Sequence, residues 1–121
     1  MRAELRGLDS ADAPDGLATF RPNDPEVFAL ALGASVGPAN GRGAELFYFQ
    51  VCSPGWIEAH PPPKGFEFMH GYLLLRRWDA DLVERAISDL CRNTQGADWD
   101  EVAAKLSRYG AWEFADYREA T

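Results

Sequence analysis

The chain has 121 residues, of which 46% are hydrophobic and 26% are charged, and these proportions are typical of a folded domain rather than a disordered chain. Its 12 Lys and Arg residues against 19 Asp and Glu residues give a formal charge of -7, which argues against a nucleic-acid-binding face. The length predicts one domain that spans residues 1–121. The acidity would suit a basic protein partner, although it also serves solubility alone.

The lack of a recognisable targeting signal and the spacing of the cysteines indicate a cytoplasmic protein. The first ten residues lack the apolar run of a secretory signal, and no stretch approaches the ~18 apolar residues that a membrane span needs. Cys52 and Cys91 lack the spacing of a metal site or of a redox pair. We therefore expect a cytoplasmic protein with no membrane partner, whose two cysteines are buried apolar side chains.

The first third of the chain predicts two strands. Residues 3–8 can extend as a strand that ends at a turn-forming run. Residues 27–36 place Phe28, Leu30 and Leu32 on one face and small side chains on the other, as in a strand with one buried face. Residues 37–43 are rich in glycine and asparagine and predict a hairpin loop.

Two further strands are expected in the middle of the chain. Residues 45–52 are rich in aromatic and β-branched side chains, so they predict the return strand of the hairpin. A short helical turn is expected at residues 55–58. Residues 66–78 predict a long fourth strand that is interrupted at Gly71.

Helices follow these strands. Asp79 can cap a helix that runs to about Thr94, and Asp98 can cap a second helix that ends at Gly110. The aromatic residues of segment 112–117 are expected to close the core. The predicted fold is α+β, with an antiparallel sheet of about four strands and two C-terminal amphipathic helices packed on one face. The residues assigned to the core are Phe28, Phe47, Phe49, Leu82, Ile87, Leu90, Trp99 and Leu106.

No arrangement of residues typical of an active site is present. His60 and His70 lack metal-ligand spacing, and Ser53 is not in a nucleophile elbow. Residues 41–43 lack the third glycine of a dinucleotide fingerprint. We therefore expect no catalytic residue, no metal and no cofactor.

Candidate partner-binding residues combine one tryptophan with carboxylates near helix starts. Trp56 follows a Pro-Gly pair in a connection that is expected to be exposed, and tryptophan serves both as a core filler and as an interface anchor. Acidic residues in a first helical turn could form a patch against a basic partner, or could simply complement the helix dipole and cap the helix. The acidic candidates are Asp79, Asp81, Asp98 and Asp100.

Three stretches, in order along the chain, resemble the immunity protein 8 family of bacterial polymorphic toxin systems. They are Ala3-Glu4-Leu5-Arg6-Gly7-Leu8, Gln50-Val51-Cys52-Ser53-Pro54-Gly55-Trp56 and Leu106-Ser107-Arg108-Tyr109-Gly110-Ala111-Trp112-Glu113-Phe114. Residues 37–43 and 59–65 carry no family pattern. The resemblance implies an α+β protein that binds and blocks a cognate toxin domain, with Trp112, Glu113 and Phe114 as structural motif residues. The toxin could be a nuclease.

Two other readings stay open. An uncovered sheet face that carries Tyr48 and Tyr72 could support self-association, for example as a homodimer. A small-molecule site would need a pocket near His70, Tyr72 and Cys52. No nucleic-acid partner is expected under any of these readings.

Overall fold

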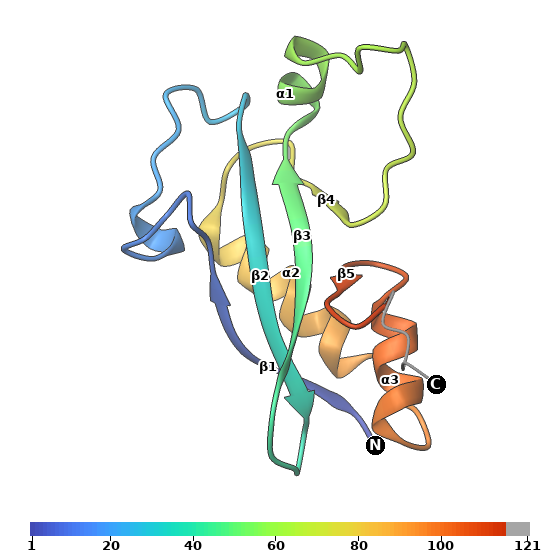
Figure 1. The fold of residues 1–121 in the computed structure, drawn as a ribbon. Helices are drawn as coiled ribbons and strands as arrows, with labels where there is room; N and C mark the ends of the chain where they lie inside the picture. The colour runs from blue at the N-terminus through green and yellow to red at the C-terminus, as the bar shows by residue number, and fades with distance from the viewer. Residues whose placement is uncertain (116–121) are drawn as a thin grey trace.

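A twisted sheet lies in front of two helices in the computed structural model, which describes residues 1–115 (Figure 1). The strand order is β1-β2-β3-β4, and β5 pairs with the same edge of β3 as β4 does. The strands are β1 (Ala3–Asp9), β2 (Ala29–Pro38), β3 (Glu45–Cys52), β4 (Tyr72–Leu74) and β5 (Ala111–Trp112). The helices are η1 (Leu17–Thr19), α1 (Pro54–Ala59), α2 (Ala80–Arg92) and α3 (Trp99–Leu106). The α+β prediction is confirmed.

The prediction of a long fourth strand over residues 66–78 is wrong. β4 has three residues and runs parallel to β3, with Gln50 opposite Tyr72. Because α1 and a long loop carry the chain back along β3 as far as Gln50, β4 enters in the same direction as β3. The outer edge of β3 is also shared with β5 at Phe47 and Tyr48, so no partner remains for a longer strand.

Alternation along β2 and β3 divides the sheet into two faces. Leu30 and Leu32 of β2 point to the same side as Phe47 and Phe49 of β3, and all four are buried. Val83, Val102 and other residues of α2 and α3 complete this core. No helix of residues 1–115 covers the opposite side, which we call the open face (Figure 1).

Both helices begin where the sequence predicts. The Asp79 carboxylate accepts a hydrogen bond from the Leu82 N–H at 3.1 Å, and the Asp98 carboxylate accepts one from the Glu101 N–H at 2.9 Å. Such caps satisfy backbone donors that the helix itself leaves unpaired. The assignment of Leu82 to the core is wrong, because its side chain is 40% exposed on the outer edge of the apolar stripe.

The expectation that the aromatic tail closes the core is met in part. The Trp112 ring stacks on Phe47, with centroids 6.3 Å apart and an interplanar angle of 11°. Phe114 instead is 43% exposed, which contradicts the expectation for that residue. Tyr117 lies outside the described residues. Among residues 1–115, no helix is both long and apolar enough to cross a membrane.

Candidate protein-binding site

The predicted acidic residues do not form one patch. Asp79 and Asp81 lie at the start of α2, whereas Asp98 and Asp100 lie at the start of α3, beyond the other end of α2. A helix of 13 residues is ~20 Å long, so the two pairs are separated by about that length. Trp56 lies elsewhere again, in α1 at the far end of the sheet from α3 (Figure 1).

Trp56 belongs to a locally organised turn. Ser53 caps α1 by accepting a hydrogen bond from the Trp56 N–H at 3.1 Å. The indole is half-buried and stacks on the His60 ring, with centroids 4.6 Å apart and an interplanar angle of 19°. The pair presents a flat aromatic surface next to the loop that follows α1.

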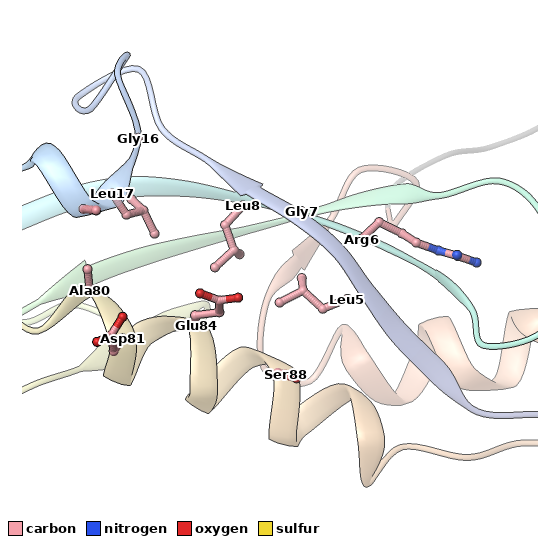
Figure 2. Close-up of a pocket in the computed structure, with 11 residues that line it drawn as sticks. Leu5, Arg6, Gly7, Leu8, Gly16, Leu17, Ala80, Asp81, Glu84 and Ser88 are labelled. Carbon is pink, nitrogen blue, oxygen red and sulfur yellow. The ribbon is translucent and has the colours of Figure 1, made fainter.

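Asp81 lines a groove of about 420 Å³ between β1 and α2, shown in Figure 2. Asp81 and Glu84 rise from α2 toward β1, while Leu5 and Leu8 point down from the strand. Arg6 points away from the two carboxylates, since its guanidinium donates to the carbonyls of Pro38 at 2.6 Å and Gly41 at 2.8 Å. The carboxylates on α2 therefore face apolar side chains on β1 across the groove, an arrangement that favours cations over anions.

Of the motif residues Trp112, Glu113 and Phe114, Trp112 belongs to β5 and the other two lie in the turn that follows it. The Glu113 N–H donates to the carbonyl of Leu46 at 3.0 Å, and the Phe114 ring meets Trp112 edge-on at a centroid distance of 6.0 Å. The indole Nε1 of Trp112 is buried, and no acceptor for it lies within residues 1–115. These contacts tie the end of the described chain to β3.

Sequence reasoning missed the two large hydrophobic residues that are most exposed within residues 1–115. Phe68 is 92% exposed and Phe66 is 65% exposed, and the neighbouring Met69 is exposed as well. All three lie between α1 and β4, in residues 60–71, which we call the aromatic loop. The strand prediction concealed them, although the three prolines before Gly65 already favoured a loop.

Hydrogen bonds hold the aromatic loop at both of its ends and at an internal turn. The Gly65 N–H donates to the Pro62 carbonyl at 2.9 Å, and Gly65 adopts a positive φ of 84° that closes the turn. At the far end, the Gly71 carbonyl accepts from the Gln50 N–H at 2.8 Å. The rings of Phe66 and Phe68 meet edge-on at a centroid distance of 6.4 Å. The exposed side chains are thus presented by an organised backbone.

The aromatic loop ends at a hollow on the open face. This hollow has a volume of about 450 Å³, and its lining includes His70 and Gly71 of the loop together with Tyr48 and Gln50 of β3. A ring nitrogen of His70, Nε2, lies 2.6 Å from the Ser107 carbonyl, which fixes the imidazole at the rim. Tyr48 is 47% exposed.

The small-molecule pocket proposed around His70, Tyr72 and Cys52 is not formed as expected. His70 lines the hollow, but Cys52 is buried and Tyr72 does not line it. Burial raises the pKa of the Cys52 thiol. Burial also raises the pKa of the Tyr72 hydroxyl, and the negative charge of the Glu67 carboxylate raises it further. Both cysteines are buried and free, as predicted. Across the described part of the chain, no three His, Cys, Asp or Glu side chains converge to hold a metal.

Comparison with known proteins identifies the family. No significant match was found among curated proteins or among solved structures. Residues 3–117, nearly the whole chain, match the family described as Immunity protein 8. The match spans all three stretches that carry the resemblance in the sequence. The chain belongs to the immunity protein 8 family.

Proposed function

We propose that this chain neutralises a cognate toxin domain by binding it in the cytoplasm of the cell that makes both, and that it does so without catalysis. Family membership supports the role of a toxin inhibitor. The observation that carries the choice of surface is the exposure of Phe66, Phe68 and Met69 on one loop. The toxin contact is placed on the aromatic loop and on the adjoining open face.

The physical argument starts from the cost of leaving this surface in water. Burying a side chain such as phenylalanine contributes ~1.5 to 3 kcal/mol, and interface energy concentrates in a few such anchors. Because the loop is held at both ends and by an internal turn, little conformational freedom is lost when a partner covers it. Occlusion of the toxin then needs only tight binding, and the chain contributes no reacting group.

The charge of the chain contributes to the rate of encounter. A net charge of -7 attracts a basic toxin domain, and such attraction raises association rates more than it slows dissociation. Many toxins that cleave nucleic acid carry a basic substrate cleft, because phosphate binding requires one. A nuclease is therefore the toxin class that we propose for the partner.

Co-expression with the toxin domain encoded beside this chain's gene tests the proposal. The chain should restore growth, and Phe66→Ala combined with Phe68→Ala should weaken affinity for an inactivated toxin at least about tenfold, measured by calorimetry. Tyr109→Ala is the matched control, because Tyr109 is an exposed aromatic residue at the end of α3. Its affinity should equal that of the unmodified chain.

Two outcomes would overturn parts of the proposal. Unchanged cell death in the presence of folded chain would remove the inhibitor function. Full affinity of the double phenylalanine variant would remove the aromatic loop from the interface. Self-association through the open face is a separate alternative, which sedimentation of the chain alone over a range of concentrations distinguishes by a rise in mass.

A further inference from the structure

Three residues form a row across the open face of the sheet. Asp9 of β1 lies opposite Gly33 of β2, and Gly33 lies opposite Tyr48 of β3. Residues opposite each other in antiparallel strands point to the same face. Asp9 and Tyr48 therefore face one another across two strand spacings, ~10 Å, with no side chain between them.

The gap in this row forms the centre of the hollow. All three residues line the cavity of about 450 Å³, and Ala31 extends its floor along β2. A Cβ placed on Gly33 would lie 2.8 Å from the Asp9 Oδ1. The carboxylate of Asp9 thus leans over the glycine and into the gap, where a side chain on β2 would otherwise exclude it.

The Asp9 carboxylate has no ion-pair partner among the described residues. It takes part in no ion pair and no side-chain hydrogen bond within residues 1–115, whereas the Glu4 carboxylate on the same strand pairs with Arg6 at 3.0 Å. Across the gap stand the exposed Tyr48 ring and the Gln50 side chain. The hollow therefore combines an unpaired anion, an aromatic face and a small apolar floor.

We infer that this hollow receives the guanidinium group of an arginine on the toxin domain, an inference that rests on the proposed function. A planar cation can lie against the Tyr48 ring while its N–H groups donate to the Asp9 carboxylate, and arginine does both better than lysine. An apolar side chain would bury the carboxylate unpaired, and an acidic one would be repelled. Gly33 keeps the space open for the incoming group.

Paired substitutions test this inference by calorimetry with the inactivated toxin domain. Asp9→Asn keeps the side-chain shape and removes the charge, and Gly33→Thr fills the gap with a residue that favours strands. Each should weaken toxin binding at least about tenfold. Asp9→Asn removes one partner of a desolvated charge pair, which speeds dissociation, and Gly33→Thr occupies the space of the incoming group. Circular dichroism should show an unchanged fold, because the only close contact of a Cβ at Gly33 is the movable end of Asp9.

Matched controls separate the site from general effects. Asp15→Asn makes the same change in net charge at an exposed position before η1 and outside the lining of the hollow, so it reports steering alone. Ser35→Thr adds the same β-branched residue two positions along β2 but outside the lining of the hollow. Both controls should bind the toxin within about twofold of the unmodified chain.

A double-mutant cycle completes the test. Each exposed arginine of the toxin is changed to alanine and measured against Asp9→Asn, and one of them should make that substitution silent. If the unmodified chain binds while Asp9→Asn and Gly33→Thr bind equally well, or if no toxin arginine couples to Asp9, the inference is overturned and the inhibitor function stands. If the unmodified chain fails to bind, the proposed function itself falls.

Discussion

The two faces of the sheet are built from the same strands and differ in what they do. On the helix-covered face, β2 and β3 carry Leu32, Phe47 and Phe49, which are buried among the residues of the core. On the open face, the same strands carry Gly33 and Tyr48, which border a hollow. Burial of side chains on the covered face therefore stabilises the fold, whereas the open face leaves apolar and charged groups available to a partner. Substitutions on the two faces should separate stability from binding.

The largest expected effect on stability comes from the covered face. Phe47 is 1% exposed and stacks on Trp112, so Phe47→Ala leaves a cavity that the sheet cannot fill by local shifts. We expect a loss of about 3 to 5 kcal/mol in the free energy of unfolding, measured by urea denaturation. A loss below about 1 kcal/mol would show that the covered face is loosely packed. The assignment of stability to the covered face and of binding to the open face would then be wrong.

The helix-covered face should also make stability depend on alkaline pH. Burial raises the pKa of the Cys91 thiol from 9.0 to about 11. The unfolded chain then releases the proton from pH 9 upward while the folded chain retains it, so the free energy of unfolding falls as the pH rises from 9 to 11. The fall is about 2 to 3 kcal/mol for this group.

Cys91→Ala provides the control for this pH dependence. Tyrosine and lysine residues also titrate in the same range, so the informative quantity is the difference in pH slope between the two proteins. The variant should lose less stability between pH 9 and pH 11 than the unmodified chain. Equal slopes would mean that Cys91 can ionise without unfolding, contrary to its burial at 1% exposure.

The sequence predicted the covered face better than the open one, and the reason is physical. A buried face requires apolar side chains at regular intervals along the chain. The alternation around Leu32 and Phe49 and the helical stripe around Val83 therefore predicted these elements from the sequence. The caps at Asp79 and Asp98 were legible because capping depends on local residues alone.

Alternation along β3 predicted that Tyr48 lies on an uncovered face, but the hollow on that face and the aromatic loop left no comparable signal. The row of Asp9, Gly33 and Tyr48 depends on the register of three strands, which includes an irregularity between Leu5 and Gly7. The short β4 depends on β5 taking part of the same edge of β3, which is a contact distant in sequence. Local patterns cannot report such pairings, and Phe68 was accordingly assigned to a strand rather than to a surface.

A moderate loss of stability should show whether Asp79, at the start of α2, serves as a helix cap or as a contact to the toxin. Asp79→Ala removes both the cap and the charge and should cost about 1 kcal/mol of stability, whereas Asp79→Asn keeps a good cap and should cost only a few tenths. Thermal unfolding measures both values. If Asp79→Asn instead weakens toxin binding tenfold at unchanged stability, these carboxylates belong to the interface and the division between the faces must be redrawn.

The smallest expected effect on stability lies at Phe68, the most exposed large hydrophobic side chain within residues 1–115. Phe68 is 92% exposed, so Phe68→Ala removes almost no buried surface and should change the free energy of unfolding by less than about 0.5 kcal/mol in urea denaturation. If Phe68→Ala leaves stability unchanged but weakens toxin binding, Phe68 contributes to the complex and not to the folding of this chain. A loss of 2 kcal/mol or more would instead mean that Phe68 packs against this chain in solution, and the aromatic loop would then be part of the core rather than a surface for a partner.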